Sequence, residues 1–543
     1  MAFPELPSEI WHSIFSKLTF RDCIRCTGVN HNLRSAVFGW DGLWHEISNE
    51  QGHAVQRFRL NTHSDQQLLL SDKVVNAMAT VNFLIEYNCN NIKEGVLVID
   101  FWPTSILYKI SSICHHSLTR LDLLCIDKLT MDTYMIPTLV LRHLPHLITF
   151  AYRAVVTQID EFVDDEPWCL FEPPINLIHR NLTELVIEMF GNGRPISMHL
   201  LLRLLPKLQR VSLNALDCSN ANATMHTLLH HCHDIEIVEI HDGQDDNFRW
   251  DNILSRQLQQ EQKRGEKSLD DVGNSDRLYT IISGGLQYLV VDGDERFLNV
   301  NTLQPIITKY QHTLRMLRIR GYEPITRLLL SQQCISHLTF SQLHSLILVN
   351  LDQPPPEMLS TLSENFCTFL RQTKGALENI NLSVADLMND TVLDCLAHQE
   401  LECLTYLRLA KSSVLSDTGF IRFLQYPGIG KQLKSLDLNE MDLLTGKILH
   451  TVAERLTSVE KLTITGCKRI GIGELQLFFS RIHLLKWLHL VCFIETEECP
   501  QQMIDYIVEQ LKNKAIEWKF VLKTNSNDNH PPSVYRVFTS DGV

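Results

Sequence analysis

The residues of this sequence that could most directly do chemistry are a group of histidines around a cysteine. His226 and His230 are four positions apart, so in a helix they share one face, and Cys232 adds a second type of zinc ligand. The group lies where a repeated helix should end, just before Ile235, and no second pair of ligands follows elsewhere in the sequence. We therefore interpret these residues as part of a helix and predict no metal site.

Two further motifs have suitable residue types but lack the context that catalysis requires. Cys23 and Cys26 have the spacing of a redox pair, without a second pair of this kind. The run from Gly428 to Lys431 is too short to cradle a phosphate. Nucleotide-binding loops and the motifs of zinc proteases and serine hydrolases do not occur. We predict no catalytic residue and no cofactor, and do not expect an enzyme.

Composition narrows the classes of partner. The 543 residues include 63 acidic and 49 basic side chains, a formal net charge of −14. This balance disfavours nucleic acids and anionic membranes, which bind basic surfaces. No apolar run is long enough for a membrane helix, and we see no secretory signal. The 15 cysteines lack the spacing of a disulfide framework, which favours the cytoplasm, the nucleus or both.

The elements that must position any functional residue come from a repeat. The pattern L-x-x-L-x-L recurs, most often at intervals of 26 to 29 residues. Its closely spaced leucines alternate as in a strand, and helical spacing follows. Stacked units of this kind form a parallel sheet on the inside of a curve, with helices outside. The copies begin at Leu118, Leu182, Leu208, Ile235, Leu286, Leu314, Leu343, Leu377, Leu404, Leu433, Val459 and Leu485.

Weaker units and interruptions complete this array. Leu144 and Leu147 indicate a weak unit, and the segments around Val96 and Trp518 are candidate end units. A polar insertion at about 242–277 has too few apolar residues to bury a core. A second insertion, residues 159–174, mixes acids with aromatic side chains. It either docks a partner or packs its aromatic residues onto its own domain.

These copies resemble the leucine-rich repeat, particularly its cysteine-containing subtype. The run Leu462-x-Ile464-x-x-Cys467-x-x-Ile470 follows the subtype's signature, and the stretch from Leu415 to Phe420, LSDTGF, follows its second half. Most other units have a different residue at the cysteine position. The resemblance covers roughly residues 91–523 and implies an α/β solenoid; an ordinary α/β domain with leucine-rich strands is the alternative.

The first fifty residues follow a different pattern. Pro7 and Ser8 are typical of a helix start, and apolar residues at Ile10, Ile14 and Leu18 then share one helical face. A second and a third short helix are expected from Asp22 and from Asn32, before Trp44. The segment resembles the F-box, with matches at Leu6, Pro7, Glu9, Ile10, Ile14, Phe15, Leu18, Asp22, Cys26, Val29, Leu33, Leu43 and Trp44. It has Asn30 and Leu33 at the positions where a second cysteine and a tryptophan are common in the family.

The F-box resemblance implies a docking surface for a Skp-family adaptor, which links to a cullin scaffold carrying a RING subunit. The residues that it implies for this contact are Leu6, Pro7, Ile10, Ile14, Phe15 and Leu18. The expected order is therefore an F-box at 1–50, a helical linker or cap at 51–90, the solenoid at 91–523 and a tail at 524–543. Together the two resemblances imply the substrate receptor of a ubiquitin ligase, acting on an unknown protein.

The alternative is a repeat scaffold without a link to a ligase, whose first helices cap the solenoid. A receptor needs the apolar face of the first helix exposed, whereas a cap buries it. Side chains next to the strand leucines should point from the concave face into solvent. These candidate substrate-binding residues are Tyr288, Arg318, Arg320, Tyr406, Arg408, Asp437, Lys461, Trp487 and His489.

Overall fold

A computed structural model describes two compact units, an N-terminal unit of residues 1–235 and 241–284 and a C-terminal unit of residues 236–240 and 285–543. Within them the described stretches are 8–15, 46–48, 92–99, 103–129, 131–159, 178–191, 198–216, 218–242, 285–293, 300–321, 338–350, 355–373, 377–399, 401–426, 429–467, 485–494, 517–524 and 534–539, with isolated residues between them. Most of the predicted linker at 51–90 lies outside these ranges, as do residues 243–277 and 160–174 of the two predicted insertions.

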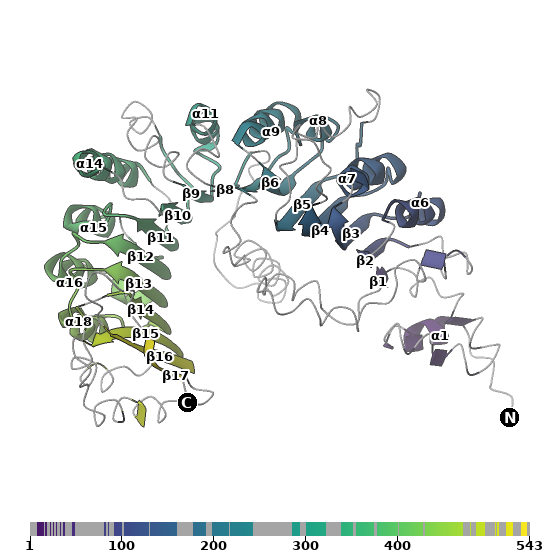
Figure 1. The fold of residues 1–543 in the computed structure, drawn as a ribbon. Helices are drawn as coiled ribbons and strands as arrows, with labels where there is room; N and C mark the ends of the chain where they lie inside the picture. Colours follow the sequence, from purple (N-terminus) through teal and green to yellow (C-terminus); the bar gives the residue numbers. More distant parts are fainter. Residues whose placement is uncertain are drawn as a thin grey trace. The chain divides into compact units, whose positions relative to one another are not determined.

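The N-terminal unit is an α/β sheet with parallel strands. Strands β1 to β6 pair in sequence order, each parallel to the next. Helices lie along one side of these strands (Figure 1). The elements are α1 (Ser8–Phe15), β1 (Glu46–Ser48), β2 (Glu94–Ile99), α6 (Pro103–Cys114), β3 (Arg120–Leu129), α7 (Met131–His143), β4 (Thr149–Ile159), β5 (Glu184–Gly191), α8 (His199–Leu202), β6 (Arg210–Leu216) and α9 (Cys218–His231). Strand β7 (Ile237–Asp242) is divided between the units.

The C-terminal unit repeats this arrangement. Strands β8 to β16 pair in order and in parallel, with helices on one side (Figure 1). The elements are β8 (Tyr288–Asp292), α11 (Val300–Tyr310), β9 (Met316–Arg320), β10 (Ser345–Asn350), α14 (Pro356–Gln372), β11 (Asn379–Val384), α15 (Asp390–Ala397), β12 (Tyr406–Ser412), α16 (Asp417–Gln425), α17 (Ile429–Gln432), β13 (Ser435–Met441), α18 (Lys447–Arg455), β14 (Lys461–Thr465), β15 (Trp487–Ile494), β16 (Glu517–Thr524) and β17 (Val534–Thr539).

The periodic leucines form the core, as their spacing predicts. The residues at the three apolar positions of all twelve L-x-x-L-x-L copies are 6% exposed or less. In each strand the two closely spaced members lie on the same face as their counterparts in the next strand, for example Leu407 beside Leu436 and Leu409 beside Leu438. A single unit could not bury such a face, so each repeat is stabilised by its neighbours.

The weak unit and the end unit around Trp518 are also built this way. In β4 the triad is Leu147, Phe150 and Tyr152, all fully buried, and Phe150 lies beside Leu121 of β3. Aromatic side chains therefore replace leucines here. At the other end, Trp518 of β16 lies beside Leu488 and is 4% exposed.

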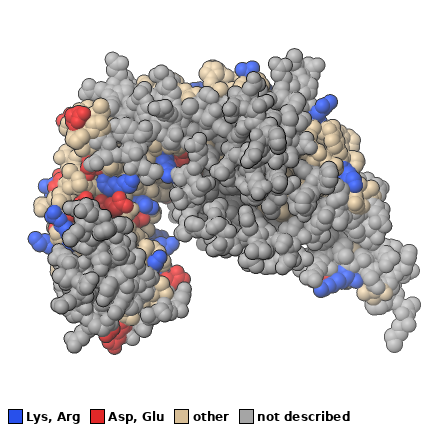
Figure 2. Space-filling view, viewed as in Figure 1, with Lys and Arg blue, Asp and Glu red and all other residues tan. Residues whose placement is uncertain are grey.

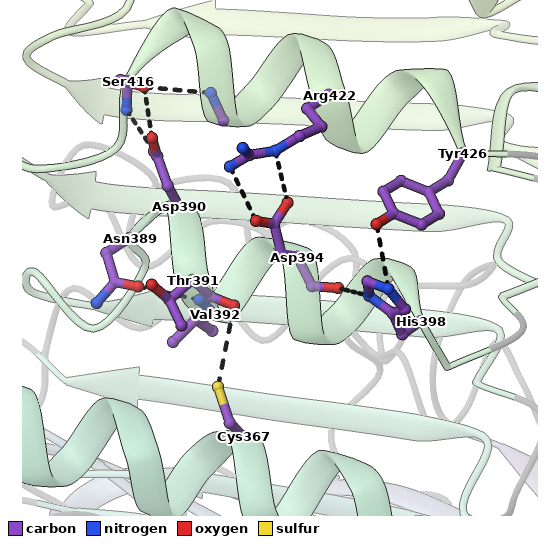
Figure 3. Close-up of polar contacts among 11 residues, drawn as sticks. Cys367, Asn389, Asp390, Thr391, Val392, Asp394, His398, Ser416, Arg422 and Tyr426 are labelled. Carbon is purple, nitrogen blue, oxygen red and sulfur yellow. Dashed lines mark hydrogen bonds and ion pairs between the residues drawn. The ribbon is translucent and has the colours of Figure 1, made fainter.

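Polar side chains join the helix layer of one repeat to the next. Asn389 caps α15 by accepting a hydrogen bond from the Val392 amide at 2.9 Å, and Ser416 caps α16 by accepting from the Gly419 amide at 3.1 Å. The Asp390 carboxylate in turn accepts from the Ser416 amide at 2.9 Å and from its hydroxyl at 2.6 Å (Figure 3). The N-terminus of α16 is thus held by the preceding repeat.

Gly419 allows this close approach between the two helices. A Cβ atom at position 419 would lie 2.2 Å from the nearer Asp390 carboxylate oxygen and 2.3 Å from its carboxyl carbon. No other residue fits without moving Asp390 away from the Ser416 cap. The next repeat has a similar contact, in which the Asp417 carboxylate accepts from the amide and hydroxyl of Thr445 at 2.7 and 2.6 Å.

The C-terminus differs from the expected tail. Residues 534–539 form β17, which pairs antiparallel with β16, Val537 lying opposite Val521. The strand's Val-Tyr-Arg-Val-Phe sequence is rich in β-branched and aromatic residues, which favour extended structure. This strand supplies hydrogen-bond partners to an edge that would otherwise be exposed.

Candidate functional site

The first candidate surface is an apolar stripe on α1. Ile10, Ile14 and Leu18 are 47%, 40% and 38% exposed. They are spaced by four residues, and the Leu18 amide donates to the Phe15 carbonyl at 3.0 Å, so Leu18 directly follows the last helical turn. The three side chains therefore extend along one side of the helix. We call Ile10, Ile14 and Leu18 the α1 stripe.

Two details of this surface differ from the expectation. Phe15, predicted to face the adaptor, is only 1% exposed and stacks on Trp11 with ring centroids 5.5 Å apart. It belongs to the small core of this segment, where Leu33 and Val37 are also buried. In contrast Val29, which matched the F-box but was not expected to contact an adaptor, is 61% exposed. Leu6 and Pro7 lie outside the described residues.

The second candidate surface consists of two polar rows across strands β11 to β15. Their side chains alternate with the buried leucines and so point away from the helix layer. The first, the Tyr406 row, contains Asn379, Tyr406, Ser435, Lys461 and Trp487; the second, the Arg408 row, contains Asn381, Arg408, Asp437, Thr463 and His489. Lys461 is exposed, and the other members are half-buried. In the space-filling view basic and acidic side chains gather side by side on the described surface of this unit (Figure 2).

The Arg408 row contains a charged pair that is not fully satisfied. Arg408 Nε and Asp437 Oδ2 are 3.6 Å apart, an ion pair too long for a hydrogen bond. Burial raises the pKa of the Asp437 carboxyl, and the nearby Arg408 charge opposes that rise. Among the described residues, Arg408 Nε, Asp437 Oδ1 and Asn379 Oδ1 are buried atoms without a hydrogen-bond partner. Both rows therefore have unused hydrogen-bonding capacity, through Arg408 and Asp437 in the Arg408 row and through Asn379 in the Tyr406 row.

Aromatic groups lie at the end of both rows. The rings of Trp487 and His489 meet edge to face with centroids 5.8 Å apart. Burial lowers the pKa of His489, and the charge of Lys519 on the next strand adds to this effect. Tryptophan, tyrosine and arginine are the side chains that contribute most to protein interfaces, and Tyr406, Arg408 and Trp487 are all partly accessible here.

The first strands of the C-terminal unit do not present the expected exposed residues. Tyr288 is 9% exposed, so the prediction that it points into solvent is wrong. Asp292, on the same strand, is 5% exposed. The Arg318 guanidinium binds Asp292 through Nη2 and Nε, at 2.7 and 3.1 Å, and is itself largely buried. Arg320 is half-buried. This pair is structural, because both of its charges are withdrawn from solvent.

The histidine and cysteine group on α9 has the geometry of a helix surface. The rings of His226 and His230 are 4.2 Å apart, but Cys232 is buried and its Sγ donates to the Leu205 carbonyl at 3.4 Å. Burial raises the pKa of the Cys232 thiol to about 12, which opposes the thiolate form that binds metals. Within the described residues, no three histidine, cysteine or acidic side chains are arranged to hold a metal ion.

Comparison with known proteins assigns the N-terminal segment. The family model of F-box-like domains matches residues 3–50. None of the curated proteins matches the chain. A solved structure titled "Crystal structure of Rad7 and Elc1 complex in yeast" is similar to the chain at 14% sequence identity and a TM-score of 0.35, over 90% of each chain. In the described residues, no helix is both long and apolar enough to cross a membrane. The chain therefore carries an F-box-like domain at residues 3–50, followed by an α/β repeat array.

Proposed function

We propose that this protein is the substrate-recognition subunit of a cullin-RING ubiquitin ligase of the Skp–cullin–F-box type. The F-box-like domain would dock on a Skp-family adaptor, and the repeats, which we assign to the leucine-rich-repeat class, would bind the protein to be ubiquitinated. The protein itself would carry out no chemistry, because holding a target near the conjugating enzyme supplies the rate advantage of proximity. We place this activity in the cytoplasm or the nucleus, where its free cysteines would stay reduced.

The α1 stripe is the observation that carries this proposal. A helix that only capped the repeat array would bury its apolar face, as the alternative scaffold function requires. Instead Ile10, Ile14 and Leu18 are each more than a third exposed, within a segment that matches the F-box-like family. Exposed apolar side chains aligned on a helix are typical of a surface that a partner covers.

Calorimetric titration of the full chain with a purified Skp-family adaptor tests this assignment. Replacing Ile10 and Ile14 with aspartate should remove about 4 kcal/mol of apolar burial, roughly a thousandfold in affinity. Ile148→Asp is the matched control, because Ile148 is 46% exposed in the same unit but directly precedes β4, away from α1 in the sequence. Tight binding by the native chain and the control, lost in the double variant, supports a ligase receptor. Absence of binding by a folded native chain would leave the repeat scaffold as the function.

The two polar rows are our candidate for the target-binding surface. Placing a photo-crosslinking amino acid at Lys461, in the Tyr406 row, should capture a ubiquitinated target. The same amino acid at Lys431, exposed on α17, provides the control on the helix side. Equal capture from both positions would contradict the assignment of the rows.

A further inference from the structure

Two cysteines meet between neighbouring helices of the C-terminal unit. Cys367 lies in the second half of α14 and is 3% exposed, whereas Cys395 lies in the last turn of α15 and is half-buried. The Cys367 side chain points from α14 toward α15, with its Sγ 4.0 Å from the Thr391 carbonyl (Figure 3). Thr391 is one helical turn before Cys395, so the sulfur of Cys367 lies against the turn that carries Cys395.

The surroundings of the two sulfur atoms differ. Arg371 Nη2 donates to Cys395 Sγ at 3.5 Å, which places a guanidinium charge beside that sulfur. Burial, together with the neighbouring Cys395 thiol, raises the pKa of Cys367 to about 12. Cys367 therefore stays a thiol, while Cys395 has the neighbouring cation and partial exposure that are typical of reactive cysteines.

We propose that Cys395 is a peroxide-reactive cysteine and that Cys367 is its resolving partner. In the first step the Cys395 thiolate attacks one oxygen of hydrogen peroxide and breaks the O–O bond, giving a sulfenic acid and, after protonation of the departing oxygen, water. In the second step the Cys367 sulfur attacks the Cys395 sulfur and the S–O bond of the sulfenic acid breaks. The Cys367 thiol proton passes to the departing hydroxyl, which leaves as a second water, and a disulfide is formed. Peroxide is reduced by two electrons, which the two thiols supply.

The disulfide would link two successive repeats covalently. Because α14 and α15 belong to neighbouring units of the array, oxidation would fix their packing and restrict local opening of the helix layer. The site lies on the helix side of the strands that carry the polar rows, so oxidation would not block those rows directly. This inference does not depend on the proposed ligase function.

Peptide mapping after treatment with hydrogen peroxide, without added reductant, tests the proposal. A protease that cleaves after glutamate separates Cys395 from Cys403 at Glu400 and Glu402. We expect a cross-linked pair of peptides containing Cys367 and Cys395, lighter by two hydrogens than the reduced pair. Cys403 is the internal control, because it is exposed but lies outside this pair.

Two variants separate the roles of the cysteines. In Cys367→Ser, the sulfenic acid on Cys395 should persist and be trapped by a 1,3-dione probe, since its resolving thiol is gone. In Arg371→Met, labelling of Cys395 by the same probe during peroxide treatment should slow severalfold, while labelling of Cys403 is unchanged. The melting temperature of each reduced variant verifies that it folds. The proposal is overturned if Cys395 reacts no faster than Cys403, or if no peptide linking Cys367 and Cys395 forms in the native chain.

Discussion

The two units place similar charged pairs on the same sheet face in different surroundings. In the N-terminal unit Arg153 Nε donates to Glu188 Oε2 at 2.7 Å, and the two side chains are 11% and 15% exposed. In the C-terminal unit the Arg408–Asp437 contact is 3.6 Å, and 37% of the Arg408 side chain is exposed. The first pair is structural, whereas the second has capacity left for a partner. Strand alternation predicts which face a side chain occupies, but not whether that face is accessible.

The apolar neighbours of these pairs show the same contrast. Val98, Leu124 and Ala151, on the same face as Arg153, are 5% exposed or less. Within the C-terminal unit, the same face of β8 and β9 is also buried, at Tyr288 and at the Asp292–Arg318 pair. Accessible polar residues dominate this face only from β11 onward. A target-binding surface is therefore expected in the last repeats.

The largest effect on stability should come from breaking the buried pair. Glu188→Ala leaves the Arg153 charge buried without its partner, so we expect the free energy of unfolding to fall by about 3–5 kcal/mol. Asp437→Ala should cost less than about 1 kcal/mol, because Arg408 can turn into water. Urea unfolding of both variants measures this difference. Equal losses would show that the two pairs have the same role.

A smaller loss of stability is expected from disturbing the contact between the N-termini of α15 and α16 in the C-terminal unit. Gly419→Ala places a methyl group against the Asp390 carboxylate and should destabilise the protein by about 1–3 kcal/mol. Thermal unfolding measures the loss. Adding Asp390→Ala removes the clash, so the double variant should lose less than the sum of the two single changes. Strict additivity would contradict the contact.

The smallest expected effects are on the pH dependence of stability, and they have opposite signs in the two units. His179 of the N-terminal unit is fixed in its neutral form: its Nε2–H donates to the Leu144 carbonyl at 3.1 Å, and its Nδ1 accepts from the Leu182 amide at 3.2 Å. Burial lowers its pKa from 6.5, so the unfolded chain takes up the proton first. Its stabilising contribution is complete above pH 6.5 and decreases as the pH falls toward the lowered pKa.

Asp437 of the C-terminal unit shows the reverse. Its raised pKa means that the folded state holds its proton more tightly, so stability decreases as the pH rises from the ordinary value of 3.8 through the raised one. Melting temperatures of His179→Gln are measured below pH 6.5, and those of Asp437→Asn above pH 3.8. Each variant should lose the pH dependence of stability that the replaced side chain contributes. A native-like profile for either variant would contradict the corresponding assignment.

The repeat and its core could be predicted from the sequence because leucines that recur at a fixed interval indicate the buried face of successive strands. The unit at β4 gave a weak signal because Phe150 and Tyr152 replace the leucines, although their burial is complete. The α1 stripe followed from helical spacing at Ile10 and Ile14. Spacing could not show that Phe15 turns inward to stack on Trp11, because this depends on tertiary packing rather than on the helical repeat.

Contacts between repeats were the least predictable part. Tyr288 was expected on an accessible face, and its burial depends on what covers that face rather than on alternation within β8. Cys367 and Cys395 are 28 residues apart, one repeat, yet single cysteines at that distance form no recognisable motif. Only the packing of α14 on α15 brings the two sulfur atoms and Arg371 together.

Hydrogen exchange of the full chain, with and without a Skp-family adaptor, tests the central claim most directly. The account predicts that the adaptor slows exchange in residues 8–18, which carry the α1 stripe, and leaves strands β11 to β15 unchanged. Protection confined to the repeats, or no protection anywhere at saturating adaptor, would contradict the assignment of this chain as a ligase receptor.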